Sequence, residues 1–417
     1  MSSPGMVSDS GRSGGVKAGD PALGGSTTPL AQPGHISLKP LLSVRDILIE
    51  MFVNRENEIL AVLTSIISGE PAILIGPPGT AKTALIETLA KLIEAKYFYY
   101  LLNPFTDPNE LLGPIDIREL RKGNYVRITA NRLPDAEIVF LDEVFKAGSA
   151  VRNLLLDIIL HKRYLNGVEY KKLPILTLYT ASNEISTDST DAAFYDRLTI
   201  RSFVKKVDRT FLKELISKAV LLAVNNHNNN LKPIVTVDYI RQLQNLTKAR
   251  ATDIINNSMM VDKVAEVINM VEAKGIELSD RRIAKLIIVA SAISLIYGEN
   301  EVSPDALAEA FRLVAPHNED DLTKIEEVLM KVKLTTISSE QLHQLLMIEA
   351  EINNVLNRIE EKKRKQRLEE LKEDIATLKE VVDNLIEVTR QLEKNPKAWR
   401  YIKKVRQTIS RASSVLR

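Results

Sequence analysis

The sequence contains no cysteine. This absence excludes disulfide bonds, cysteine zinc sites, iron–sulfur ligation and a thiol nucleophile. Histidine is also scarce, and its positions do not have the spacing of metal ligands. The five histidines are His35, His161, His227, His317 and His343. We therefore expect no structural metal site.

Long apolar runs are missing as well. Even LISKAVLLAV (residues 215–224) is interrupted by Lys218, and it is shorter than the roughly 18 apolar residues that a membrane span needs. The N-terminus has no apolar segment of the kind found in secretory signals. These absences lead us to expect a cytoplasmic protein without a membrane span. The net charge of +2 leaves the kind of partner open.

The first half of the sequence predicts a tail followed by an α/β domain. Residues 1–40 are rich in Gly, Ser, Pro and Thr and are expected to be disordered. From 41 to 206, helical patterns alternate with short apolar runs, which are typical of parallel strands buried on both faces. Strands are expected in AILI (72–75), YFYYLL (97–102), AEIVFLDE (136–143) and ILTLYTAS (175–182). The predicted fold is a doubly wound parallel sheet.

The second half is predicted to be helical. Residues 207–318 show helical periodicity and are expected to form a small helical domain, and residues 319–417 a charged helical extension. In the extension, apolar residues recur every three or four positions, which favours a helical hairpin or coiled coil. They are Ile348, Ile352, Val355 and Ile359, then Leu371, Ile375, Leu378, Val382 and Leu385. Residues 397–417 carry seven Lys or Arg and no acidic residue.

The stretch GPPGTAKT (76–83) lies between the first predicted strand and a helical pattern. It matches the phosphate-binding pattern Gly-x-x-x-x-Gly-Lys-Ser/Thr, except that Ala81 replaces the second glycine. Lys82 would neutralise the outer phosphates, and the hydroxyl of Thr83 would bind Mg2+. The other residues that would surround the phosphates are Gly76, Pro77, Pro78, Gly79, Thr80 and Ala81. The prediction is ATP with Mg2+, and the alternative is a tight turn with a chance lysine.

Polar residues end two further predicted strands. Asp142 and Glu143 end the third strand, and Asn183 follows the fourth. Ligands of doubly wound sheets bind at this carboxyl edge. Asp142 would belong to the Mg2+ shell, and Glu143 would orient or deprotonate the attacking water. The amide of Asn183 can bond both a water and a phosphate oxygen, although asparagine after a strand is also a common turn former.

The order of these motifs resembles that of AAA+ ATPases, in particular the MoxR family and most closely its RavA (regulatory ATPase variant A) branch. The resemblance covers about residues 41–330, and alanine before the lysine is a trait of the family. Its specific segments are PFTDPNELLGPIDI (104–117), LPDAEIVFLDEVFKA (133–147), RYLNGVEY (163–170), AFYDRLTIRSF (193–203) and SDRR (279–282).

The resemblance implies a role for each matched position. Residues 76–83 correspond to the Walker A loop, Asp142 and Glu143 to Walker B, and Asn183 to sensor 1. Arg197 corresponds to the arginine finger, which in this family reaches the nucleotide of the neighbouring subunit. Arg281 corresponds to the sensor 2 arginine, with the adjacent Arg282 left as an alternative.

The resemblance also implies a hexameric ring that remodels or activates partner proteins, together with a von Willebrand factor A (VWA) domain on a separate protein. IDIRELRKGNYVRIT (115–129) and RYLNGVEYKK (163–172) resemble hairpins that project toward a central pore in related machines. Two alternatives stay open. One is a nucleic-acid motor or loader that uses the basic segment 397–417, and the other is a scaffold whose hydrolysis is incidental.

Overall fold

The computed structural model describes most of the chain between residue 36 and residue 334. The described residues are 36–186, 189–207, 211–224, 231–332, 334, 348, 351–352, 354–356, 358–359, 368–393, 408–409 and 412. Residues 1–35 of the expected tail lie outside them, and the first helix starts within the rest of that segment. The segment 397–417, on which the nucleic-acid alternative depends, is described only at 408–409 and 412.

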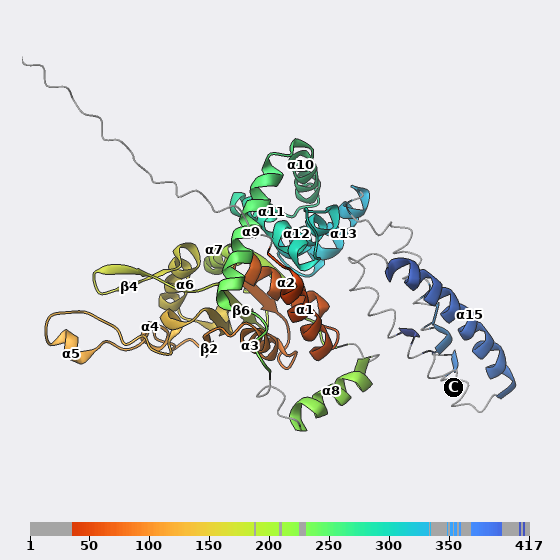
Figure 1. Cartoon of the computed structure of the whole chain (residues 1–417), viewed down its shortest axis with the longest axis horizontal. Coiled ribbons are helices and arrows are strands. Elements are labelled where there is room, and N and C mark those ends of the chain that lie inside the picture. Colours follow the sequence, from red (N-terminus) through yellow and green to blue (C-terminus); the bar gives the residue numbers. More distant parts are fainter. Residues whose placement is uncertain are drawn as a thin grey trace, which may run out of the picture. The chain divides into compact units, whose positions relative to one another are not determined.

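A five-stranded parallel sheet forms the centre of the N-terminal domain (Figure 1). Its strands are β1 (Ala72–Ile75), β2 (Tyr97–Leu101), β3 (Ile138–Asp142), β6 (Thr177–Ser182) and β7 (Ile200–Phe203), in the order β2-β3-β6-β1-β7. All four pairings are parallel. The α/β class predicted from the apolar runs is confirmed, and β7 is a fifth strand that those runs did not indicate.

Helices cover both faces of this sheet because its strands alternate their side chains between two buried clusters. Ala72 and Leu74 of β1 belong to one cluster, and Ile73 and Ile75 to the other. The longer helices of the domain are α1 (Lys39–Met51), α2 (Glu56–Ser68), α3 (Lys82–Leu92), α6 (Ser149–His161) and α7 (Ser189–Arg197). Short turns are α4 (Pro108–Leu112), α5 (Ile117–Leu120), η1 (Leu133–Asp135) and η2 (Val144–Lys146).

A bundle of helices follows the sheet, and we call α9 to α13 the lid. The helices are α8 (Leu212–Val224), α9 (Val237–Ile255), α10 (Ser258–Glu272), α11 (Asp280–Ile296), α12 (Pro304–Val314) and α13 (Asp320–Lys331). Helix α11 packs against α2, α9 and α12, so the lid is attached to the sheet domain. Helix α13 packs against α10 and α12, so the packing continues past the expected boundary at 318. Within the described residues, no helix is both long and apolar enough to span a membrane.

The C-terminal part has its own hydrophobic cluster, which brings the two predicted apolar stripes together. Helix α15 (Leu368–Glu393) supplies one side. The buried members are Ile348, Ile352, Val355, Leu356, Ile359, Leu378, Val381, Val382, Leu385 and Ala412. Members of both predicted stripes therefore pack together, whereas the side chain of Leu371 lies outside the described part of the structure.

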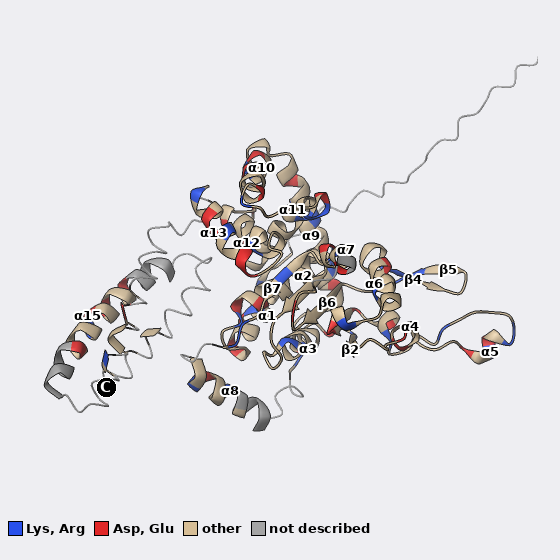
Figure 2. Cartoon of the chain, turned by 180° about the vertical axis from the view of Figure 1, so that it is seen from behind, with Lys and Arg blue, Asp and Glu red and all other residues tan. Residues whose placement is uncertain are grey.

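Two exposed segments extend from the sheet domain side by side (Figure 2). One is the antiparallel hairpin of β4 (Arg163–Asn166) and β5 (Glu169–Lys172). The other contains α5 and a single antiparallel bridge between Ile115 and Arg127, and is therefore less regular than a hairpin. The two segments touch where the backbone N–H of Arg127 donates to Oδ1 of Asn166 over 3.1 Å.

Candidate functional site

The loop of residues 76–81 joins β1 to α3 and is shaped by close backbone approaches. A Cβ on Gly76 would lie 2.1 Å from the carbonyl oxygen of Val204, so only glycine fits there. Helix α3 starts at Lys82, and its N-cap residue, Ala81, makes no side-chain hydrogen bond to the start of the helix. The first N–H groups of a helix have no intrahelical acceptor, and the helix dipole favours an anion near them. The loop therefore fits a phosphate chain.

Two residues at this end of the sheet adopt the left-handed backbone conformation that usually requires glycine. Ala81 has φ 66°, and Glu143 has φ 55°. Each costs about 1 kcal/mol relative to ordinary conformations. Such outliers concentrate at functional sites, where the surrounding structure holds them in place. Ala81 thus adopts a conformation suited to the glycine of the general phosphate-loop pattern, and Glu143 is set in a fixed direction at the end of β3.

The charged side chains of the site are partly removed from water. Lys82 is 8% exposed, and its Nζ donates to the carbonyl oxygens of Gly76 (2.6 Å) and Pro77 (3.1 Å). Burial lowers the pKa of Lys82, although Asp142 and Glu143 act in the opposite direction. Burial also raises the pKa of Asp142. A phosphate beside the ammonium and a cation beside the carboxylate would restore the favourable interactions that water no longer provides.

Glu143 and Asn183 come together across neighbouring strands. The Nδ2 of Asn183 donates to Oε1 of Glu143, and Oε2 of Glu143 lies 3.3 Å from Nζ of Lys146. Strand β6 lies between β1 and β3, so Asn183 lies between the loop at 76–83 and the two acidic residues. The structure thus gathers the loop, Asp142, Glu143 and Asn183 at one edge of the sheet.

Substitution of two glycines tests how closely the rest of the protein packs around this loop. We expect Gly76→Ala to lower the free energy of unfolding by about 3 kcal/mol, because the new Cβ clashes with a backbone carbonyl. Gly79→Ala should cost only about 1 kcal/mol, because φ is +75° there but no atom lies within 4 Å of the new Cβ. Urea unfolding of both variants tests this, and equal losses would contradict the described loop.

Arg197 and Arg281 both make contacts with helix α7. Arg197 ends α7, and its Nη1 donates to the carbonyl of Ala193 over 2.6 Å. Arg281, at the start of α11, lies with Nη1 3.1 Å from Oδ2 of Asp196, the residue before Arg197. Among the described residues, neither guanidinium bonds the loop at 76–83.

The structure distinguishes Arg281 from its neighbour Arg282. The side chain of Arg281 is 40% exposed, whereas Arg282 is 1% exposed. Arg282 donates to the carbonyls of Val314 and Pro316, and its Nη1 lies 3.1 Å from Nε2 of His317. Burial lowers the pKa of Arg282 to about 9. Arg282 therefore holds the end of α12 in place, and Arg281 is the arginine that is accessible.

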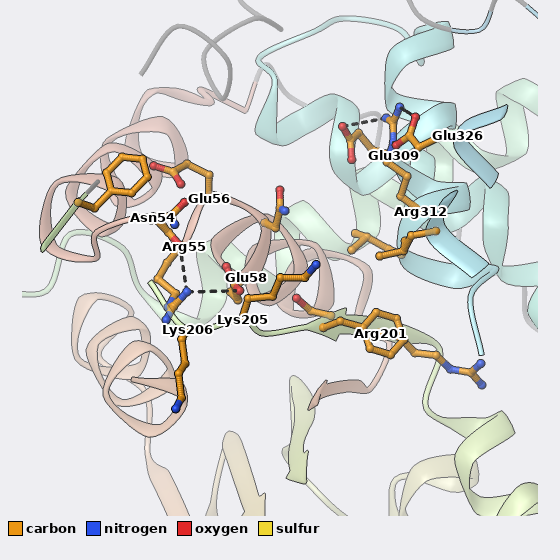
Figure 3. Close-up of a pocket in the computed structure, with 16 residues that line it drawn as sticks. Asn54, Arg55, Glu56, Glu58, Arg201, Lys205, Lys206, Glu309, Arg312 and Glu326 are labelled. Carbon is orange, nitrogen blue, oxygen red and sulfur yellow. Dashed lines mark hydrogen bonds and ion pairs between the residues drawn. The ribbon is translucent and has the colours of Figure 1, made fainter. Parts of the chain in front are cut away.

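A cavity of about 490 Å3 lies between the sheet domain and the lid (Figure 3). Arg55 lines it on the sheet side, and its Nε donates to the carbonyl of Thr80 over 3.1 Å. Arg312 lines it on the opposite side, where it pairs with Glu309 (3.0 Å) and Glu326 (2.5 Å). No sequence motif indicated this cavity, because α2, β7, α12 and α13 together form its wall.

Part of the sequence matches the model of a protein family, and the fold matches that of a solved structure. The MoxR domain of the MoxR–vWA–β-propeller ternary systems matches residues 39–245. A crystal structure of a Cytophaga hutchinsonii protein assigned as an ATPase superposes with a TM-score of 0.56. It covers 71% of this chain and 94% of its own chain, and at 20% identity it shows the fold alone.

Similar full-length proteins are found in an archaeon. One uncharacterised protein of Methanocaldococcus jannaschii is 33% identical over 362 residues, which are 85% of this chain and 94% of that protein. A second is 32% identical over 355 residues, covering 85% and 89%. A structural protein of Acidianus two-tailed virus is 30% identical over 225 residues, covering 52% of this chain and 36% of its own length.

Proposed function

This chain belongs to the MoxR family of AAA+ ATPases, and on that premise we propose that it hydrolyses ATP to remodel or activate partner proteins. The proposal rests on one observation, which is that four elements lie together at one edge of the sheet: the loop at 76–83, Asp142, Glu143 and Asn183. The matched family model is that of the MoxR–vWA–β-propeller systems. It favours that branch, and the RavA branch suggested by the motifs gains no support.

Each residue at this edge has a role that follows from its chemistry. The loop would hold the phosphates, with Lys82 against the outer ones. Thr83 and Asp142 would hold Mg2+, which would neutralise part of the negative charge of the phosphates. Glu143, held by Asn183, would orient or deprotonate the attacking water. The cavity between Arg55 and Arg312 has the volume for a base and ribose.

Arg197 would serve the nucleotide of a neighbouring subunit, and Arg281 would be the sensor 2 arginine of the lid. Arg197 is the last residue of α7 and bonds the carbonyl of Ala193, whereas Arg281 is at the start of α11 and contacts Asp196 of α7. A guanidinium supplied by another subunit stabilises the charge of the transferring phosphoryl group and makes hydrolysis depend on assembly. We therefore propose a ring, with six subunits as the expected number.

The partners would be proteins. The family model names vWA and β-propeller components, so we propose that a separate VWA-domain protein acts with this chain. The paired exposed segments, α5 with its flanks and the β4–β5 hairpin, would contact the substrate protein. They carry large exposed apolar side chains such as Ile117 (66% exposed) and Val168 (96% exposed).

ATP hydrolysis by the purified chain tests the proposed function. We expect turnover that requires Mg2+ and that rises more steeply than linearly with protein concentration, because a site needs its neighbour. The mass of the chain in solution should increase with Mg-ATP. Absence of turnover at concentrations where the chain is assembled would overturn the ATPase proposal, and turnover by a monomer would overturn the ring.

A further inference from the structure

The helix that carries Arg197 is fastened to the lid by the two residues before it. The hydroxyl of Tyr195 donates to the carbonyl of His317 over 2.7 Å. Oδ1 of Asp196 accepts from Oγ of Ser279 over 2.8 Å, and its Oδ2 pairs with Arg281 over 3.1 Å. These contacts reach two separate lid segments, the start of α11 and the residues after α12. The last turn of α7 is therefore bonded to the lid at two places.

A buried arginine strengthens the same junction. Arg201 of β7 is 1% exposed, and it donates to the carbonyls of Tyr195 (2.9 Å) and Pro316 (2.9 Å). Its guanidinium also lies 3.9 Å from the centre of the Tyr195 ring. Burying a guanidinium is costly unless its donors are bonded. The arrangement thus ties the segment at 316–317 and the end of α7 to one another through β7.

Tyr195 also contacts the turn that carries the candidate catalytic acid. The ring of Phe145, two residues after Glu143, packs edge-on against Tyr195 with centroids 5.9 Å apart and planes at 64°. Phe145 packs in the same manner against Phe194, at 6.3 Å and 81°. The side chain of Tyr195 therefore lies between the turn after β3 and the lid.

The lid segment to which Tyr195 bonds comes directly after α12 in the sequence, and α12 forms part of the cavity wall. Glu309, Arg312 and Leu313 of α12 line the cavity, and α12 ends at Val314. Three residues later, His317 accepts the bond from Tyr195. A ligand that shifts α12 would therefore shift the segment at 316–317, and with it the end of α7.

We propose that Tyr195 and Asp196 are positioning residues that set Arg197 according to the position of the lid. The nucleotide of one subunit would thereby control hydrolysis in the neighbour that Arg197 serves. This inference rests on the proposed function, because it assigns a regulation to the finger of that ATPase. The two residues bond the lid, and Arg197 follows them directly in the chain, so their proposed effect on hydrolysis acts through the placement of Arg197.

The test compares two tyrosines with the same kind of bond. Tyr195→Phe removes the hydroxyl that donates to His317, and Tyr179→Phe removes one that donates to the carbonyl of Val62, both over 2.7 Å. Both side chains are buried. We expect similar losses of thermal stability. The turnover number should fall about fivefold for Tyr195→Phe, in line with one lost hydrogen bond, with KM for ATP unchanged. Tyr179→Phe should stay within about twofold of wild type.

Mixed rings show whether the defect acts in the neighbouring subunit. The Tyr195→Phe chain is mixed with an excess of the Glu143→Gln chain, which keeps a normal Arg197. As the reference, the wild-type chain is mixed with the Glu143→Gln chain at the same ratio, and the ATPase rate of the first mixture is divided by that of the second. The rate per Tyr195→Phe subunit should recover to the wild-type level, whereas a structural defect within the subunit would persist. No recovery, or equal turnover for both tyrosine variants, would overturn the inference. An inactive wild-type chain would instead refute the proposed function.

Discussion

Lys82→Ala is expected to weaken ATP binding by about 10- to 100-fold and to abolish hydrolysis. A charge-assisted bond to a phosphate is worth about 1.5–3 kcal/mol, which corresponds to this loss of affinity. The side chain of Lys82 is enclosed by the loop, and its Nζ lies on the carbonyls of Gly76 and Pro77. It is therefore aimed along the loop and not into solvent. Calorimetric titration with ATP and a turnover assay measure both effects.

A second lysine on the same helix provides the control. Lys91 of α3 pairs with Glu87 over 2.8 Å, and its side chain is 34% exposed. A surface ion pair of this kind contributes at most about 1 kcal/mol. Lys91→Ala should therefore bind and hydrolyse ATP like the wild type. If the two lysine variants bound ATP equally well, the loop would not be a phosphate site.

Glu143→Gln is expected to reduce hydrolysis by about 100-fold or more while leaving ATP binding intact. The amide keeps the size of the side chain, but it cannot accept a proton from water, and general base catalysis contributes about 10²–10⁴-fold. Asn183 already holds Oε1 of Glu143, so the carboxylate is oriented before any substrate arrives. Single-turnover kinetics with ATP, followed by recovery of unhydrolysed ATP from the complex, measure the effect.

The same substitution at a neighbouring glutamate isolates the role of Glu143. Glu184 follows Asn183 at the same sheet edge, and its side chain is exposed. Glu184→Gln makes an identical chemical change without touching Glu143. Its turnover should equal that of the wild type. Normal turnover by Glu143→Gln would assign the base to another group and leave the acidic pair with a metal-binding role only.

The sheet and the arrangement at its edge could be predicted because they follow from local patterns. Four apolar runs gave four strands, and parallel strands bring their carboxyl ends together whatever their separation in sequence. That rule places Asp142 and Asn183 beside the loop at 76–83. Strand β7 escaped prediction because it carries the buried Arg201, whose charge interrupts the apolar run. The roles assigned to the edge residues stay predictions.

The cavity and the different surroundings of Arg281 and Arg282 could not be predicted from the sequence, because both depend on tertiary structure. Arg55 and Arg312 face the same cavity although 257 positions (312 minus 55) separate them, and no local pattern encodes that meeting. Successive helical residues point about 100° apart, so Arg281 and Arg282 had to face different surroundings. Only the packing shows that Arg282 is enclosed by the end of α12, whereas Arg281 lies against α7.

Mixing two inactive variants tests the central claim most directly, which is that Arg197 of one subunit completes the nucleotide site of the next. Arg197→Ala lacks the finger but keeps Glu143, and Glu143→Gln lacks the acid but keeps the finger. Each alone should hydrolyse ATP at less than about 1% of the wild-type rate. Their mixture should regain a substantial part of that rate, because an Arg197→Ala site then receives a finger from its neighbour. A mixture as inactive as its components, in rings shown to contain both chains, would contradict the account.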